Sequence, residues 1–218
     1  MSKSIGSIAL ERRVDALFAR YTAPGSPGAV VAVMQEGEVV LSKGYGLASI
    51  ELDVPITPAT RFRIASVSKQ FTVSAALMLA AEGKLDLKAP PHKYLRELAP
   101  LPVTVDQMMR NCSGLPDFLE LLRLGGHGLD KPARPEDLYA ACVRNRHLNF
   151  TPNSRFLYSN TNFLLLGQVV EKLEGQPLEA VLERRFGLVL FIILASIIGG
   201  FVLFKYAFEG SGHVGCGF

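Results

Sequence analysis

The chain has 218 residues, 49% of them hydrophobic and 20% charged, which fits one domain with a short appendage and excludes a disordered chain. Its 23 Lys and Arg against 20 Asp and Glu leave a net charge of +3, without the basic patch that binds nucleic acid. Three scattered cysteines and four histidines without ligand spacing argue against a disulfide framework and a metal site.

The amino-terminal segment predicts an amphipathic helix and not a secretory signal. Residues 1–21 contain no long apolar stretch, because charged residues from Glu11 to Asp15 interrupt them. They therefore lack the apolar core of a signal peptide, and we expect a cytoplasmic protein. One face of the helix would carry the apolar residues Ile8, Leu10, Val14, Leu17 and Phe18.

The segment up to residue 60 predicts a β-hairpin. A turn rich in Pro and Gly at residues 24–28 is followed by AVVAVM, residues 29–34, and by VVLSKGYGLA, residues 39–48. The two runs are rich in β-branched residues and are separated by a short polar turn that contains Gly37. This pattern is typical of two antiparallel strands joined by a tight turn.

Residues 61–185 carry mostly helical patterns. The segment FTVSAALMLAAEGKL, residues 71–85, predicts a strong helix that ends at Gly83. A second helix would begin after Thr104 as its N-cap, and a third would have Pro135 in its first turn. Two further helices are expected at residues 162–176 and 177–186.

The composition changes sharply after residue 185. Residues 186–204, FGLVLFIILASIIGGFVLF, contain no charged residue, and as a helix they would span about 28 Å, close to the thickness of a bilayer core. We therefore favour a transmembrane helix at residues 186–208, while two buried strands remain the alternative. The expected division is a domain at residues 1–185, the hydrophobic segment 186–208 and a Gly-rich tail at residues 209–218.

The first pattern with catalytic potential is Ser66-Val67-Ser68-Lys69, which stands just before the helix expected from residue 71. Side chains three residues apart on a helix have Cβ atoms about 5–6 Å apart, so the amine of Lys69 could reach the hydroxyl of Ser66. A serine hydroxyl needs such a base to become a nucleophile. The same residues also fit an ordinary helix start, with Ser66 as the N-cap and Lys69 exposed.

A second pattern, Tyr158-Ser159-Asn160, precedes another apolar helix. A tyrosine that faces a lysine can carry a proton, and an asparagine offers both a donor and an acceptor to the amide of a substrate. The alternative is structural. Tyr158 would then be a buried residue with a satisfied hydroxyl, and Asn160 would cap the next helix.

Three segments in this order resemble the serine β-lactamase-like hydrolases. They are RFRIASVSKQFT, RNCSGLPDF and TPNSRFLYSNTNFLLLGQVVEKLEGQPL, and they carry the S-x-x-K motif of that group together with a Y-x-N motif. The SVSKQFT run and the SGLPD loop look most similar to the D-aminopeptidase branch. The resemblance covers residues 10–186. It implies an α/β (α+β) fold, in which a helical region accompanies the N-terminal hairpin and the sheet is incomplete.

The resemblance also implies a serine hydrolase that acts through an acyl-enzyme on a peptide amide or an ester. Ser66 would attack the carbonyl, Lys69 would accept its proton, Tyr158 would protonate the leaving group, and Asn160 would hold the substrate amide. Such chemistry needs no metal and no organic cofactor. The expected partner is a small-molecule or peptide substrate, without nucleic acid, and with a membrane contact through residues 186–204.

The family's third motif has one candidate here, the His213-Val214-Gly215 sequence in the tail. By resemblance His213 would bind substrate, although it follows Tyr158 much sooner than the family's spacing requires. A membrane helix at residues 186–208 would place His213 on the far side from Ser66. The alternative functions are therefore a truncated, membrane-tethered relative with little or no turnover, or a purely membrane-associated interaction protein. Buried strands would instead let His213 reach the site.

Overall fold

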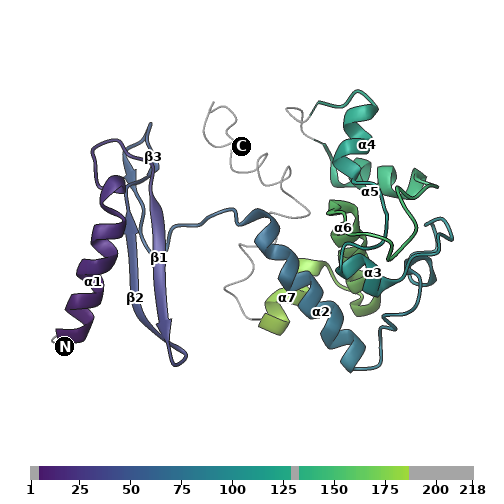
Figure 1. Ribbon diagram of the computed structural model, residues 1–218, viewed down its shortest axis with the longest axis horizontal. Helices are drawn as coiled ribbons and strands as arrows, with labels where there is room; N and C mark the ends of the chain where they lie inside the picture. The colour runs from purple at the N-terminus through teal and green to yellow at the C-terminus, as the bar shows by residue number, and fades with distance from the viewer. Residues whose placement is uncertain (1–4, 129–132, 187–218) are drawn as a thin grey trace. The chain divides into compact units, whose positions relative to one another are not determined.

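A computed structural model of the chain describes residues 5–128 and 133–186 (Figure 1). The described residues fall into two compact units that meet in sequence at Phe62 and Arg63. The first unit contains the strands, and the second is helical. Each unit is described separately below.

A β-hairpin forms the centre of the first unit, as the sequence predicts. Strand β1, Ala29–Gln35, pairs antiparallel with β2, Glu38–Tyr45. The two residues between them, Glu36 and Gly37, both have positive φ angles, 52° and 83°. Two consecutive residues with positive φ are typical of the type I′ turn, whose twist matches that of the flanking strands. The short strands β3, Leu47–Ser49, and β4, Val54–Pro55, form a second antiparallel pair.

Helix α1, Ile5–Leu17, lies along β2, and the short 3₁₀ helix η1, Ala19–Tyr21, follows it (Figure 1). Val14 packs with Leu41 and Tyr45, two buried residues of β2. The partly buried Leu10 and Phe18 pack against this cluster. The predicted apolar face is partly wrong, because Leu17 is 77% exposed and Ile8 is 41% exposed. Residues spaced by four form one narrow stripe on a helix, and Leu17 lies beside that stripe.

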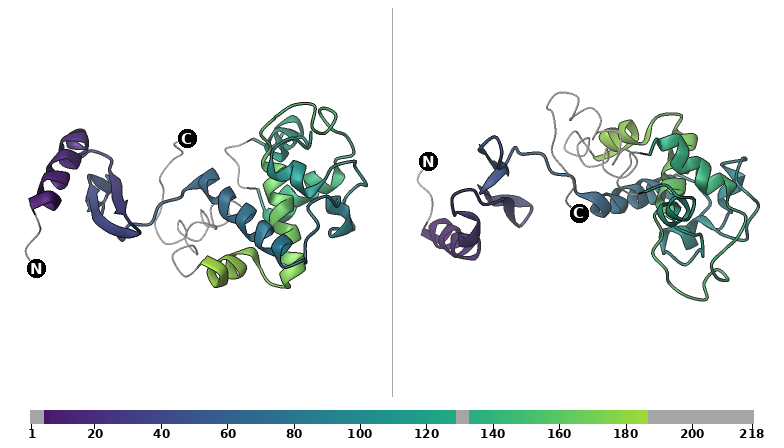
Figure 2. Two further views of the ribbon diagram at one scale, coloured as in Figure 1. Left: turned by 60° about the horizontal axis from the view of Figure 1, so that its bottom comes forward. Right: turned by 90° about the horizontal axis from the view of Figure 1, so that it is seen from above.

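The helical unit is built on α6, Asn160–Glu174, with α2, Lys69–Ala81, and α7, Leu178–Phe186, packed against it (Figures 1 and 2). All three helices follow the predicted segments. Their apolar sides form one core with the shorter helices. Its most deeply buried side chains include Leu79, Val105, Met108, Leu166, Val169, Val170, Val181 and Leu182.

Local sequence signals explain where α2 ends. Gly83 follows the C-cap with a positive φ of 74°. The N–H of Gly83 donates to the carbonyl of Ala80, and the N–H of Lys84 donates to the carbonyl of Leu79. These two bonds make a Schellman motif, which favours glycine because its left-handed position penalises a side chain. The predicted end of this helix at Gly83 is confirmed.

Shorter helices connect the large ones: η3, Pro91–Lys93, α3, Val105–Met109, α4, Phe118–Leu124, and α5, Pro135–Arg144. Thr104 caps α3 and forms a reciprocal capping box with Gln107, and Pro135 opens α5, both as expected. The sequence reading missed α4. Its N-cap is Asp117, whose carboxylate accepts the N–H of Leu119 at 2.8 Å.

The described residues therefore have a mixed α/β architecture with two small two-stranded sheets and a larger helical region. This agrees with the α/β (α+β) expectation in its main features. Across residues 5–128 and 133–186, no helix is long and apolar enough to cross a membrane. Beyond Phe186, the hydrophobic segment 186–208 and the tail 209–218 lie outside the described residues. The membrane helix, its strand alternative and the predicted domain division thus stay predictions.

Candidate active site

Ser66 and Lys69 lie at the start of α2. The chain enters this helix through the 3₁₀ helix η2, Ala65–Ser68. Residues i and i+3 eclipse each other in a 3₁₀ helix, so this geometry aligns the two side chains. The Nζ of Lys69 donates a hydrogen bond to the Oγ of Ser66 at 2.7 Å. Lys69 is only 8% exposed, whereas Ser66 is accessible to solvent.

The backbone just before Ser66 has an unusual conformation. Ala65 has a positive φ of 43° although it carries a side chain. Such a conformation costs free energy and persists where surrounding contacts hold it, often at functional sites. Here the buried hydroxyl of Ser68 donates to the carbonyl of Ala65 at 2.6 Å. Ser68 therefore stabilises the turn that presents Ser66.

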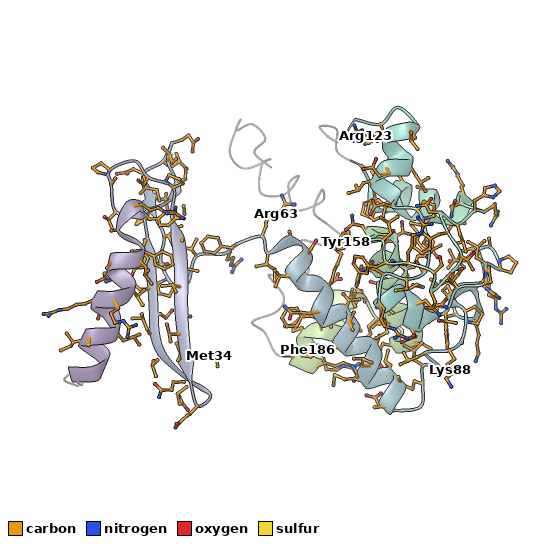
Figure 3. The ribbon with its side chains drawn as sticks, viewed as in Figure 1. Met34, Arg63, Lys88, Arg123, Tyr158 and Phe186 are labelled. Carbon is orange, nitrogen blue, oxygen red and sulfur yellow. The ribbon has the colours of Figure 1, made fainter. Side chains whose placement is uncertain are left out.

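Tyr158 completes a three-residue cluster around the hydroxyl of Ser66. Its Oη lies 2.7 Å from the Oγ of Ser66, and either oxygen can donate the hydrogen. The side chain of Tyr158 lies beside the N-terminal part of α2 (Figure 3). At 43% exposure it is not the buried tyrosine of the structural alternative. The structure thus brings Ser66, Lys69 and Tyr158 together.

Two aromatic rings surround the amine of Lys69. Its Nζ lies 5.0 Å from the ring centre of Tyr158 and 5.4 Å from that of Phe163. Phe163 is buried in α6, so it forms a fixed apolar wall. An ammonium group is attracted to an aromatic face at such distances. This packing directs the Nζ of Lys69 towards Ser66.

Asn160 is the first residue of α6, directly after the N-cap Ser159. Its backbone N–H and its side-chain Nδ2 both donate to the Oδ2 of Asp117, at 2.5 and 2.8 Å. Asn160 is therefore not the cap of the helix, contrary to the structural alternative. Because a carboxylate can only accept hydrogen bonds, this contact fixes which side of the Asn160 amide faces Asp117. The Oδ1 of Asn160 lies on the other side of the amide.

The loop of residues 110–117 holds the Tyr158 segment, and no role for it was deduced from the sequence. Asn111 and Asp117 bond to residues on both sides of Tyr158, and Pro116 accepts the hydroxyl hydrogen of Thr161 at 2.7 Å. These residues stand in RNCSGLPDF, a segment that carried the family resemblance. The only sequence signal was therefore their membership of that segment.

His213, the remaining predicted binding residue, lies outside the described residues, so its place relative to Ser66 stays a prediction. Within the described ranges, no group of three or more His, Cys, Asp or Glu side chains is arranged to hold a metal ion. The functional roles assigned to Ser66, Lys69, Tyr158 and Asn160 also remain predictions at this point.

Comparison with known proteins places these features in a family. The Beta-lactamase family model matches residues 14–188. The D-aminopeptidase of Gluconobacter oxydans (strain 621H) is 32% identical over 81% of this chain and 33% of its own length. The D-aminopeptidase of Brucella anthropi is 36% identical over 73% of this chain and 30% of its own length.

A solved structure agrees with these relatives. The D-amino acid amidase of Ochrobactrum anthropi SV3, complexed with L-phenylalanine, matches 83% of this chain and 49% of its own length, with a TM-score of 0.67 and 25% identity. The chain spans about a third of the length of the curated relatives it matches. From the span of the family match and the identity of these relatives, the chain belongs to the Beta-lactamase family.

Proposed function

We propose that the helical unit is a serine hydrolase that cleaves peptide amides through an acyl-enzyme on Ser66. The observation that carries this proposal is the position of the Ser66 hydroxyl, 2.7 Å from both the Nζ of Lys69 and the Oη of Tyr158. A serine hydroxyl becomes a nucleophile when a base within hydrogen-bond reach takes its proton. Two groups that can exchange that proton lie within reach.

The first half of the reaction forms the acyl-enzyme. The Oγ of Ser66 bonds to the carbonyl carbon of the substrate while its proton passes to the Nζ of Lys69, the base in this step. Tyr158 then delivers a proton to the leaving nitrogen, and Lys69 replaces the proton that Tyr158 has given up. The carbon–nitrogen bond breaks, and the amine departs.

The second half restores the enzyme. A water molecule attacks the ester that links the substrate to Ser66, and its proton passes to the same pair of residues. The bond to the Oγ breaks, the oxygen takes back a proton, and the carboxylic acid leaves. No atom is oxidised or reduced, and Lys69, Tyr158 and water account for the proton transfers between Ser66 and the substrate.

Asn160 would orient the substrate beside this cluster. The Nδ2 and the backbone N–H of Asn160 both donate to Asp117. The amide oxygen of Asn160 is therefore the group best placed to accept an N–H from the substrate. This orientation suits an amide substrate, which offers such a donor.

The relatives support an amide of a D-amino acid or of a short peptide as the substrate. Two similar proteins are named D-aminopeptidase, and a similar structure is a D-amino acid amidase. An ester would react by the same steps and serves here as a probe. None of the described residues favours the membrane-tethered alternative, which rests on residues 186–208.

The test is covalent labelling of Ser66 in the full chain. The protein is treated, with and without detergent, with a fluorescent activated ester and a fluorescent penicillin, and the labelled peptide is identified by mass spectrometry. We expect labelling of the wild type and none of Ser66→Ala. Ser74→Ala serves as the matched control, because the Ser74 hydroxyl donates within its own helix, to the carbonyl of Gln70.

Turnover is then measured on D-alanine amide and L-alanine amide. The proposal predicts hydrolysis that Ser66→Ala abolishes and that favours the D form. Folded wild-type protein that takes up neither probe and releases no ammonia from either amide would contradict the proposed function.

A further inference from the structure

Asn111 bonds to the chain on both sides of Tyr158. Its backbone carbonyl accepts the N–H of Leu157 at 3.0 Å. Its side-chain Oδ1 accepts the N–H of Ser159 at 3.1 Å. Tyr158 lies between these two peptide groups. Asn111, which precedes Tyr158 by 47 positions in the sequence, therefore holds the backbone that carries the phenol.

Asn111 is itself held firmly. It is 8% exposed, and its Oδ1 also accepts the Nδ2 of Asn162 at 3.0 Å. Asn162 is fully buried in α6, and its own Oδ1 accepts the hydroxyl of Ser113 at 2.6 Å. These buried bonds resist displacement, because breaking one of them leaves a buried polar group without a partner.

The backbone of Asn111 explains why this residue can make both contacts. Its φ is 55°, in the left-handed region, where asparagine is tolerated better than most residues. Its own N–H donates to the carbonyl of Met108 at the end of α3. The turn therefore leaves the carbonyl and the side-chain oxygen free to face the Tyr158 segment.

The Tyr158 segment needs such support. Residues 151–159 form neither helix nor strand, and the Tyr158 ring is 43% exposed, so packing holds it only in part. Proton transfer requires the phenol oxygen to stay within about 2.6–3.2 Å of its partner. A displacement of about 1 Å can lower a rate by roughly a hundredfold.

We propose that Asn111 is a positioning residue that holds the hydroxyl of Tyr158 at Ser66 by binding the peptide groups on either side of Tyr158. This inference rests on the proposed function, because the position of the phenol matters for catalysis only if Tyr158 carries a proton. Asn111 does not touch the reacting atoms. It acts through the backbone of residues 157–159.

Two substitutions separate the side chain from the backbone. Asn111→Gly keeps the left-handed turn and the carbonyl that binds Leu157, but it removes the Oδ1 that binds Ser159. Asn111→Asp keeps an oxygen that can accept the same N–H, so it is the conservative rescue. Thr104→Ala is the matched control, because it removes the N-cap of α3 without a contact to the Tyr158 segment.

The first readout is independent of activity. Amide hydrogen exchange, followed by NMR on the full chain, reports whether the N–H of Ser159 has lost its partner. We expect exchange at Ser159 to become at least tenfold faster in Asn111→Gly and to stay near the wild-type rate in Asn111→Asp. Thr104→Ala should accelerate exchange in α3 and not at Ser159.

The second readout is hydrolysis of D-alanine amide, whose leaving nitrogen needs the proton from Tyr158, resolved into the maximal rate and the concentration for half-maximal rate. We expect Asn111→Gly to lose ten- to a hundredfold in the maximal rate with little change in the half-maximal concentration. Asn111→Asp should recover most of this loss. Folded Asn111→Gly that hydrolyses the amide at the wild-type rate would overturn the inference.

The two proposals fail differently. If the folded wild type is neither labelled at Ser66 nor active on either amide, the proposed function is wrong, and the exchange of the Ser159 amide still decides whether Asn111 holds this segment. If the wild type is labelled and Asn111→Gly behaves like Thr104→Ala in both readouts, the positioning role is wrong and the proposed function stands.

Discussion

The phenol oxygen of Tyr158 is the group in the site that one substitution can remove most cleanly. Tyr158→Phe deletes this oxygen and keeps the ring beside Phe163, 6.4 Å away between centres. General acid–base groups contribute roughly 10²–10⁴ to a rate, so we expect a loss of that order in acylation of Ser66 by an amide substrate. Stopped-flow measurement of amine release checks this loss.

An activated ester provides the internal control for Tyr158→Phe. Its leaving group departs without protonation, so the loss should be clearly smaller with the ester than with the amide. Thermal unfolding should change little, because the ring is 43% exposed and its apolar contacts remain. Equal losses on both substrates would show that Tyr158 does not protonate the leaving group.

The contrast between Lys69 and Asn111 shows what sequence reasoning can find at a site. The approach of Lys69 to Ser66 was predictable, because the two residues are three apart at a helix start and lie in a motif. The contacts of Asn111 and Asp117 were not, since their partners lie more than forty residues away and depend on a left-handed turn. Tertiary contacts of this kind leave no periodic pattern.

At the scale of helices and turns, prediction succeeded where a local signal is strong. Three features follow from the conformational preferences of one or two residues each: the hairpin turn, the end of α2 at Gly83 and the start of α5 at Pro135. Helix α4 was missed because its seven residues are too few to show a periodic pattern, and its start depends on the Asp117 cap. The 3₁₀ geometry of η2 was also unexpected, although the approach of Ser66 to Lys69 was not.

The junction of α6 and α7 contains a half-buried acid, Glu171, that makes stability depend on pH. Glu171 accepts the N–H of Leu178, the first residue of α7, at 2.8 Å, and the side-chain amide of Gln168 at 2.5 Å. Burial raises the pKa of Glu171 above its usual value of 4.5. A raised acid pKa means that the folded state binds more protons than the unfolded state. The stabilising contribution of Glu171 is therefore present at low pH and is lost as the pH rises through its folded-state pKa.

Glu171→Gln tests this junction, because glutamine cannot ionise but still offers an oxygen to Leu178. We expect the free energy of unfolding of the variant, relative to the wild type, to increase as the pH rises from about 4.5 to 7. Urea unfolding at several pH values measures it. Glu120→Gln, on the exposed side of α4, is the control. A difference between Glu171→Gln and the wild type that stays constant with pH would contradict the expectation.

At the scale of the whole chain, the family match takes in residues of both units, from α1 onwards, and not the helical unit alone. The match covers residues 14–188, and the last described helix ends at Phe186. Ser66, Lys69, Tyr158 and Asn160 all lie in the helical unit, and their mutual positions come from α2, α6 and the loop of residues 110–117. The stability of this one unit therefore governs the geometry of the site.

An ion-pair network holds the ends of the three main helices of this unit together. Glu82 at the end of α2 accepts two hydrogen bonds from Arg185 in α7, at 2.6 and 3.2 Å. Arg185 also pairs at 3.0 Å with Glu174 in α6, whose side chain is 4% exposed. Arg184 and Lys84 add further contacts to Glu174. The network joins segments that are about a hundred positions apart in sequence.

Acid should weaken this network and with it the helical unit. Hydrogen bonds from Arg185 and Lys84 lower the pKa of Glu82 from 4.5 to about 2. A lowered acid pKa means that the unfolded state binds more protons, so the stabilisation is present above the unfolded-state pKa and is lost as the pH falls through the folded-state value. We therefore expect the difference in unfolding free energy between the wild type and Glu82→Gln to shrink as the pH falls from about 5 to 2.

High salt should reduce the same difference in unfolding free energy at neutral pH, because the Glu82 carboxylate is accessible to solvent. Urea unfolding measures both effects, with the exposed Glu179→Gln as the control. A difference that is the same at pH 2 and pH 5 would show that Glu82 does not stabilise the unit through its charge.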